Sequence, residues 1–257
     1  MKPQPSQPAP PSSRSAARIV SLAVLAAVLF AVFCSLGVWQ VQRRAWKLEL
    51  ISQVEQRVHQ PAAQAPGPAQ WPSLSRSGDE YRHVQTDGTP LYDRETLVQA
   101  TTDYGSGYWV MTPLQLRDGG TVLINRGFVL PAWRKLPAPR PAPGEMRVAG
   151  LLRMSEPDLR FLRHNDPARN IWYSRDTGAI ATARGLGEVA PYFIDVEKTP
   201  GQASDPAVAP VPGLTVIDFP NNHLSYAITW FVLAAMVIVG AVIALRAERR
   251  GRDDGDA

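Results

Sequence analysis

The sequence is almost free of cysteine, because Cys34 is the only one in 257 residues. A disulfide therefore cannot form within the chain, and no Cys-x-x-Cys pair is present. This excludes a thiol-based copper chaperone and a disulfide oxidoreductase, both of which need two neighbouring thiols. Since Cys34 lies inside an apolar segment, we expect it to act as a small hydrophobic side chain.

Two long segments lack charged residues altogether. Residues 19–39 and 224–245 contain no Asp, Glu, Lys or Arg. As helices rising about 1.5 Å per residue, both are long enough to cross a bilayer core of roughly 30 Å. They exclude a soluble globular protein, and their number excludes a polytopic channel or transporter. The residues between them, 40–223, are enough for one ordinary domain.

The sequence also lacks the motifs of several enzyme classes. No two of its four histidines stand at a metal-ligand spacing, and no His-Glu-x-x-His occurs. Nucleophile-elbow, Walker and dinucleotide-binding motifs are missing as well. No motif in the sequence therefore points to a particular enzyme class. A membrane-tethered periplasmic hydrolase or sensor stays open, because catalytic residues can be scattered along a sequence.

Basic and acidic residues nearly balance in the central region, and most of the excess positive charge lies near the N-terminus. The net charge of +4 comes mainly from the N-terminal region, whereas residues 19–245 are nearly neutral. A nucleic-acid-binding domain needs a basic face, so we expect no nucleic-acid partner. Four arginines follow the second span within seven residues, and basic residues favour the cytoplasmic side. We therefore expect a bacterial inner (cytoplasmic) membrane protein with both termini cytoplasmic and the domain periplasmic.

Composition divides the chain into seven expected parts. The parts are a disordered cytoplasmic tail (1–18), transmembrane helix 1 (19–39) as an uncleaved anchor, a helical extension (40–59), a Pro/Ala linker (60–73), a periplasmic β-rich domain (74–223), transmembrane helix 2 (224–245) and a cytoplasmic tail (246–257).

The central domain shows short apolar runs separated by Gly and Pro turns. Candidate strands lie at 81–86, 96–101, 107–116, 121–130, 146–152, 192–196 and 214–219, and a short helix is expected at 176–186. The pattern predicts two transmembrane α-helices flanking one mostly antiparallel β domain, a small barrel or sheet of α+β type.

Six short runs occur in a fixed order along the chain. They are LGVWQVQRRAWK at 36–47, GYWVMTPL at 107–114, VLINRGFV at 122–129, NIWYSRD at 170–176, YFID at 192–195 and NNHLSYAITW at 221–230. Together they resemble the surfeit locus protein 1 family of cytochrome c oxidase assembly factors, in its bacterial type. The resemblance extends over roughly residues 36–245 and is judged by motif order.

This resemblance implies a function in the biogenesis of a haem-copper terminal oxidase. It implies haem a as a transient cofactor, taken from haem a synthase and passed to oxidase subunit I, with the lipid bilayer as a further partner. No bond is made or broken in such a transfer. The alternative is a non-haem membrane scaffold that stabilises nascent subunit I.

His223 is the sharpest candidate site residue. It stands at the outer edge of the second apolar segment, where a neutral imidazole can ligate haem iron. The alternative is an amphipathic residue at the headgroup boundary that hydrogen-bonds a loop carbonyl. The resemblance implies that His223 is the haem a ligand. One axial histidine leaves the opposite axial position open, which suits a carrier.

Aromatic and basic residues flank the outer ends of both spans. Trp39, Trp46, Tyr226 and Trp230 are either the aromatic belt of a membrane protein or a wall for the porphyrin. Trp46 is also a candidate structural or partner residue. Arg43 can pair with a haem propionate or with lipid phosphates.

Arginine and glycine residues of the central domain are candidates for structure or for partner binding. Arg126 is expected to pair with Asp176 or Asp195, with propionate or partner contact as the alternative. Gly107 and Gly127 are expected to permit a bulge or close packing.

The run at 170–176 is typical of a loop-to-helix junction. Trp172 is the expected core residue and Asp176 the expected helix cap. A partner surface that includes Arg175 is the alternative.

Overall fold

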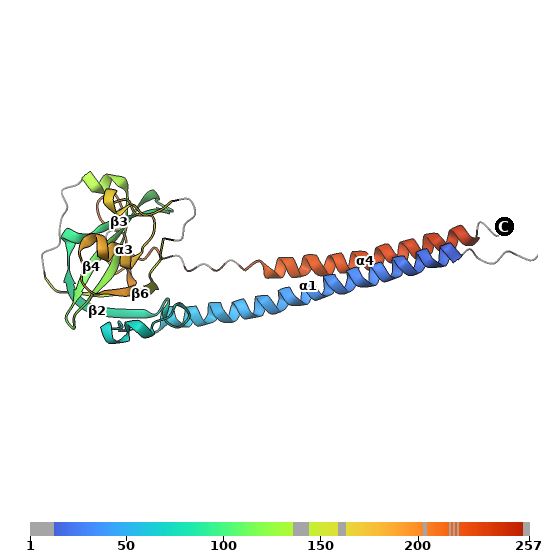
Figure 1. Cartoon of the computed structure of the whole chain (residues 1–257), viewed down its shortest axis with the longest axis horizontal. Helices are drawn as coiled ribbons and strands as arrows, with labels where there is room; N and C mark the ends of the chain where they lie inside the picture. Colours follow the sequence, from blue (N-terminus) through green and yellow to red (C-terminus); the bar gives the residue numbers. More distant parts are fainter. Residues whose placement is uncertain are drawn as a thin grey trace, which may run out of the picture. The chain divides into compact units, whose positions relative to one another are not determined.

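The computed structural model describes residues 13–135, 144–158, 163–202, 205–215, 217, 219 and 221–253. Within these residues the chain forms two compact units (Figure 1). One unit combines residues up to 51 with those from 219 onward and holds two long helices. The other, residues 52–218, is a β domain.

The two long helices are α1 (Ser13–His59) and α4 (His223–Asp253). Each is long and apolar enough to cross a membrane, as the charge-free segments predict. Both extend beyond the expected spans, so the disorder expected at residues 13–18 is wrong, and residues 246–253 are helical. These stretches contain no proline and are rich in Ala and Arg, which favour helix. The rest of both expected tails lies outside the described residues.

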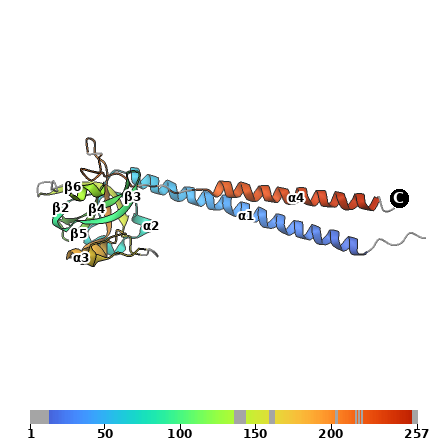
Figure 2. The ribbon, with the colours of Figure 1, turned by 90° about the horizontal axis from the view of Figure 1, so that it is seen from above.

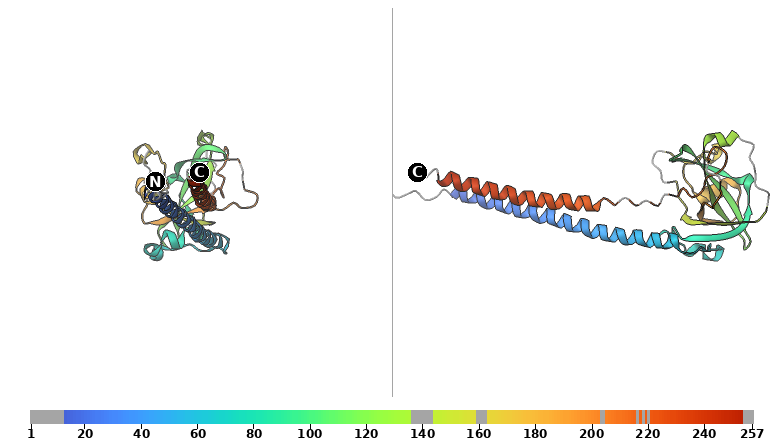
Figure 3. Two further views of the ribbon diagram at one scale, coloured as in Figure 1. Left: turned by 90° about the vertical axis from the view of Figure 1, so that its right-hand side faces the viewer. Right: turned by 180° about the vertical axis from the view of Figure 1, so that it is seen from behind.

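Small residues let α1 and α4 approach each other, and the two helices lie side by side (Figures 2 and 3). Gly37 of α1 faces the ring of Phe231, and a Cβ atom at Gly37 would lie 2.7 Å from that ring. One turn earlier, the rings of Phe33 and Trp230 stack with centroids 5.8 Å apart. Ala227 and Ala234 of α4 are buried. These contacts fix the spacing of the helices in their outer halves.

The β domain is built from short strands and helical turns. The strands are β1 (Ala63–Gln64), β2 (His83–Pro90), β3 (Thr96–Thr102), β4 (Gly105–Leu116), β5 (Thr121–Val129), β6 (Met146–Met154) and β7 (Val189–Val196). The helical segments are α2 (Arg76–Asp79), α3 (Thr177–Arg184) and the 3₁₀ turns η1 (Pro68–Ser73), η2 (Tyr92–Arg94), η3 (Pro131–Lys135) and η4 (Pro167–Arg169).

Five of these strands close into a barrel. The sheet order is β1-β2-β6-β7-β5-β4-β3, and an additional β2–β4 pairing joins β2, β6, β7, β5 and β4 in a ring. The β1–β2 and β5–β7 pairs are parallel, and the others are antiparallel. Closure removes free edges from the ring and leaves β3 as an added strand beside β4. The expected two-span, mostly β architecture is therefore confirmed.

Strand β5 lies between two apolar layers, which explains its nearly unbroken apolar sequence. Val122 and Ile124 point into the main cluster, whereas Leu123 points into a second cluster with Trp172 and Ile180. Successive side chains of a strand face opposite sides. Burial of both faces therefore requires apolar residues at almost every position.

The prediction of a strand at 214–219 is wrong for the described residues 214, 215, 217 and 219, which are irregular. Residues 216 and 218 lie outside the described part. The other six predicted strands are present, with boundaries shifted by a few residues. The expected helix at 176–186 is present as α3 and ends at the left-handed cap residue Gly185.

The segment expected to be a Pro/Ala linker, residues 60–73, is part of the β domain. It contains β1 and η1, and Trp71 is buried in the main apolar cluster. The indole Nε1 of Trp71 donates to the carbonyl of Pro66 at 2.9 Å, and the hydroxyl of Tyr192 donates to the same oxygen at 2.8 Å. Burial of Trp71, with its N–H hydrogen-bonded, stabilises a folded conformation of this segment despite its Pro- and Ala-rich composition.

Candidate functional site

A polar pair joins the outer parts of α1 and α4. His223, the first residue of α4, is half-buried, and its Nδ1 lies 2.8 Å from Oε1 of Gln40. Gln40 is on α1 and is only 9% exposed. An amide oxygen only accepts hydrogen bonds, so Nδ1 is the donor. When the ring is neutral, this contact places its one proton on Nδ1 and leaves the lone pair on Nε2.

The remaining capacity of this site for hydrogen bonds or ligands is unused within the described part of the chain. No described residue forms a hydrogen bond with Nε2 of His223. Two residues earlier, Oδ1 of Asn221 is buried and has no described partner. Buried polar atoms are normally paired, and a native exception often marks a binding role.

The aromatic candidates occupy different positions around the helices. Trp39 and Tyr226 are exposed, as is Trp46, which carries the guanidinium of Arg43 over its ring at 4.1 Å. Trp230 instead packs against α1 through its contact with Phe33. The structure thus brings His223 together with Gln40 and leaves exposed aromatic rings on neighbouring turns of both helices.

The donor set at this site fits a haem and does not fit a bare metal ion. An imidazole whose Nδ1 proton is held by an oxygen acceptor is the usual arrangement of a metal-ligating histidine. Structural metal ions need three or four protein ligands. No group of three or more His, Cys, Asp or Glu residues able to hold a metal occurs within the described residues. The site therefore offers one imidazole nitrogen as a potential ligand, with exposed aromatic rings elsewhere on the same two helices.

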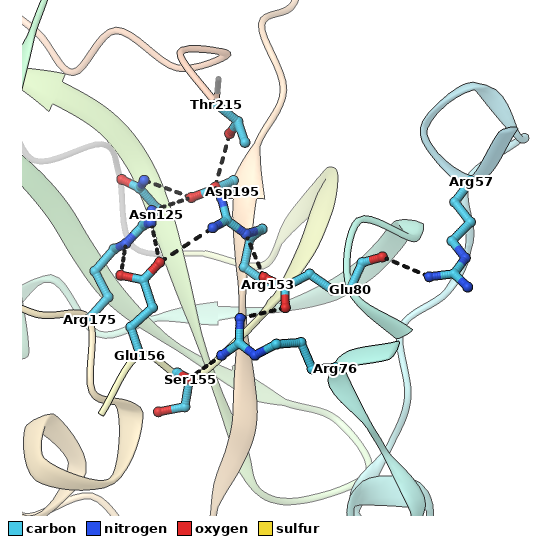
Figure 4. Close-up of polar contacts among 10 residues, drawn as sticks. All are labelled: Arg57, Arg76, Glu80, Asn125, Arg153, Ser155, Glu156, Arg175, Asp195 and Thr215. Atoms are coloured by element: carbon cyan, nitrogen blue, oxygen red, sulfur yellow. Dashed lines mark hydrogen bonds and ion pairs between the residues drawn. The ribbon is translucent and has the colours of Figure 1, made fainter. Parts of the chain in front are cut away.

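A second polar cluster lies in the β domain (Figure 4). Asp195 of β7 is 4% exposed and accepts from Arg153 and Arg175 at 3.2 Å each. It also accepts from Asn125 at 2.8 Å and from Thr215 at 2.9 Å. Both carboxylate oxygens therefore have two donors each.

The two arginines of this cluster are paired just as completely. Arg153 donates to Glu80, Glu156 and Asp195, and Arg175 makes a two-pronged contact with Glu156 at 2.6 and 3.0 Å. Burial lowers the pKa of the Arg153 guanidinium, but the nearby carboxylates, with Asp195 foremost, outweigh burial and leave its pKa raised. The arginine therefore stays charged.

Two cavities of about 500 and 660 Å³ lie beside this cluster, and Trp109 and Arg175 line both. Arg153 and Arg175 donate to the carboxylates of the cluster, and Arg153 also lines the larger of the two cavities. The buried cluster therefore holds β6, β7 and the loop before α3 together.

The sequence matches the SURF1 family model over residues 27–235. It is 35% identical to Surfeit locus protein 1 of Xenopus tropicalis over 221 residues, which cover 78% of this chain and 68% of that protein. It is 36% identical to the human protein of the same name over 222 residues, covering 78% and 69%. This chain belongs to the SURF1 family. The family match includes Gln40, His223 and all strands of the barrel.

Arg126 of this SURF1 chain pairs with a carboxylate, as expected, but the two named partners, Asp176 and Asp195, are wrong. Arg126 pairs with Glu95 at 2.6 Å and lies over the ring of Tyr92 at 5.1 Å, whereas neither Asp176 nor Asp195 contacts it. Strand alternation is the reason, because the neighbouring residue of β5, Asn125, already faces Asp195. Arg126 consequently points to the opposite side of the sheet.

Four other candidates of the β domain lie at buried, helix-capping or closely packed positions. Trp172 is 1% exposed, and Asp176 caps α3 by accepting from the backbone N–H of Ala179 at 3.0 Å. Gly127 has φ +126° and lies against the backbone of Val211, where a Cβ atom would come within 2.3 Å. At Gly107 a Cβ atom would meet the carbonyl of Val129 at 2.2 Å.

Two sets of important residues were missing from the sequence prediction. The partners Glu80, Glu156 and Arg153 have no local signal, because the fold brings them together across the barrel. Gln40 does have a signal. An amide at the edge of a long apolar helix needs a buried partner, and His223 at the matching edge of the second span is the available one.

Proposed function

We propose that this chain assists the assembly of a haem-copper terminal oxidase by holding haem a at His223 and delivering it to oxidase subunit I. The hydrogen bond between Nδ1 of His223 and Gln40 is the observation that supports this proposal most strongly. It leaves Nε2 as the iron-binding atom of a neutral imidazole. Membership of the SURF1 family supports the link to cytochrome c oxidase.

Haem a is cargo in this proposal, and its iron supplies the Lewis acid that accepts a nitrogen lone pair. His223 donates that lone pair through Nε2. Exposed rings at Trp39 and Tyr226, and in part Trp230, offer apolar surface for a macrocycle. Arg43 offers a guanidinium that can form two parallel hydrogen bonds with a propionate.

One protein ligand suits a carrier better than an enzyme or an electron-transfer protein. With His223 alone, the opposite axial position is available to a ligand of the receiving protein. Transfer then exchanges one axial bond for another. No covalent bond of the cargo changes, so the chain acts as a chaperone and not as a catalyst.

We also propose an inner-membrane location with the β domain on the periplasmic side. The arginines that follow the second span support cytoplasmic termini. The helix pair then places His223 at the periplasmic surface of the inner membrane. Haem a synthase as donor and subunit I as acceptor are both membrane proteins, so cargo could move without entering water.

The test is haem a content after co-expression with a haem a biosynthetic pathway. We expect purified wild-type chain to carry haem a with an absorption spectrum of a histidine-ligated iron. His223→Ala should lose it, whereas His164→Ala should not, because His164 is an exposed histidine of the β domain. Unchanged haem content and an unchanged Soret band in His223→Ala would refute ligation.

A non-haem scaffold gives a different result in cells. Deletion of the chain should lower the amount of assembled oxidase under either interpretation. Restoration of full oxidase activity by His223→Ala would favour the scaffold. Failure of His223→Ala to restore activity, at wild-type expression, supports haem delivery.

A further inference from the structure

We propose that Gln40 is a positioning residue that selects the Nδ1–H form of His223 and so presents Nε2 as a ligand. This inference rests on the proposed function, because it concerns how the haem-binding atom is prepared. It assigns a role to a residue on the other helix, 183 positions away in sequence.

The first step is the chemistry of the histidine ring. A neutral imidazole carries one proton, which can reside on either nitrogen. With the proton on Nε2, that atom has no lone pair for a metal. The hydrogen bond made by one nitrogen decides which nitrogen is free. Oε1 of Gln40 accepts from Nδ1 at 2.8 Å and thereby favours the ligating form.

The second step is the rigidity of the acceptor. Gln40 is buried at 9% exposure, and one turn away Gly37 packs directly against Phe231 of α4. A buried amide whose oxygen lost its donor would be left unsatisfied, at a cost of about 1–3 kcal/mol. Gln40 and His223 therefore hold each other in place, and the ring keeps its orientation before any ligand arrives.

The third step concerns the choice of an amide over a carboxylate. A carboxylate at this position would attract the Nδ1 proton more strongly and make Nε2 a stronger donor to iron. It would also place a negative charge in an apolar setting. An amide orients the ring at lower basicity, which suits a carrier that must release its cargo.

The direct test is the tautomer of His223 in haem-free protein. The full chain, labelled with ¹⁵N-histidine and placed in lipid nanodiscs at a pH where histidine is neutral, would be measured by NMR. His223→Ala identifies the His223 signals. Wild type should show a protonated Nδ1 and an unprotonated Nε2. Gln40→Leu should shift His223 toward the Nε2–H form, and Gln40→Glu should retain Nδ1–H.

The matched control is Gln42→Leu, because Gln42 is an exposed glutamine on the same helix. It should leave the tautomer unchanged. If Gln40→Leu also left His223 in the Nδ1–H form, the inference would be overturned. Gln40→Glu keeps a polar acceptor and so guards against a general packing defect as the cause of the shift.

Haem a affinity provides the second readout. Loss of such a supporting hydrogen bond typically weakens metal binding about 10–100-fold. We expect a loss of this size in Gln40→Leu, with binding kept or tightened in Gln40→Glu. If wild type binds no haem a, the proposed function fails while the tautomer result still stands. If Gln40→Leu binds haem a as tightly as wild type, the inference fails and the proposed function survives.

Discussion

His223 and Asp195 are both ionisable groups removed at least in part from solvent, but they differ in how fully their hydrogen-bonding capacity is used. Asp195 receives four donors, two on each oxygen. His223 uses one of its two ring nitrogens. A group whose hydrogen-bonding positions are all occupied by neighbouring residues stabilises the fold. A group that keeps an unused lone pair can bind a ligand.

The same difference distinguishes Arg153 and Arg175, whose role is structural, from His223, which is the candidate for ligand binding. Buried ion pairs contribute little net stability relative to apolar packing, yet removal of one partner is costly because the other charge stays buried. Changes to the β-domain cluster should therefore act on stability. Changes at His223 and Gln40 should act on binding with the fold intact.

The largest effect on stability is expected from Arg175→Ala. It leaves Arg153 as the one remaining described arginine partner of Glu156 and Asp195, and it removes a cation–π contact with Phe193 at 4.6 Å. We expect a loss of about 3–5 kcal/mol in the free energy of unfolding. Urea unfolding of the full chain in detergent micelles, followed by near-ultraviolet circular dichroism, measures it.

Arg169→Ala is the matched control for this prediction, because its side chain is 79% exposed in its pair with Asp166. It should change stability very little. Equal losses of stability in Arg175→Ala and Arg169→Ala would show that the buried cluster does not stabilise the β domain. The contrast between a structural cluster at Asp195 and a binding site at His223 would then be contradicted.

Trp71→Ala sharpens the comparison by testing where the β domain begins. The indole is buried in the main cluster, so its removal should cost about 3 kcal/mol. A true linker residue would give almost no change. Trp133→Ala, at the one half-buried residue of the otherwise exposed turn η3, provides a tryptophan control with a smaller expected loss.

Tyr192→Phe should cost about 1 kcal/mol, because it removes the hydroxyl that donates to Pro66 while Trp71 still satisfies that oxygen. Burial raises the pKa of Tyr192 in the folded chain. A raised pKa means that this contribution is complete below the unfolded value of about 10 and is lost as pH rises above it. Wild-type stability should therefore fall more steeply above pH 10 than that of Tyr192→Phe.

The smallest effect is expected from Asp87→Asn. The hydrogen bond from Arg147 holds the pKa of this exposed carboxyl below its usual value. A lowered pKa contributes stability at neutral pH that is lost as pH falls below about 4. Melting curves between about pH 6 and pH 2 should show slightly less acid sensitivity in Asp87→Asn. A large change would mean that exposed pairs matter as much as the buried cluster.

The two helices and six strands were predictable because their signals are local. Charge-free length marks α1 and α4, and apolar runs between Gly and Pro turns mark the strands. The role of residues 60–73 was hidden by their composition, since only the fold shows that Trp71 enters the barrel. The partner of Arg126 was missed because the choice between Glu95 and Asp195 depends on which face of β5 each residue occupies.

The candidate site was partly visible in the sequence. His223 stood out as a histidine at the edge of an apolar span, and Gln40 lay in the motif at the matching edge of the other span. Their hydrogen bond depends on the register between two helices far apart in sequence, which close packing at Gly37 sets.

The most direct test is the ratio of haem a to folded chain in His223→Ala and Arg175→Ala, each co-expressed with the haem a pathway. Folded His223→Ala should carry no haem a and should lose less stability than Arg175→Ala. Folded Arg175→Ala should be less stable but should carry haem a at the wild-type ratio. A wild-type ratio in His223→Ala, or its loss from folded Arg175→Ala, would contradict the account.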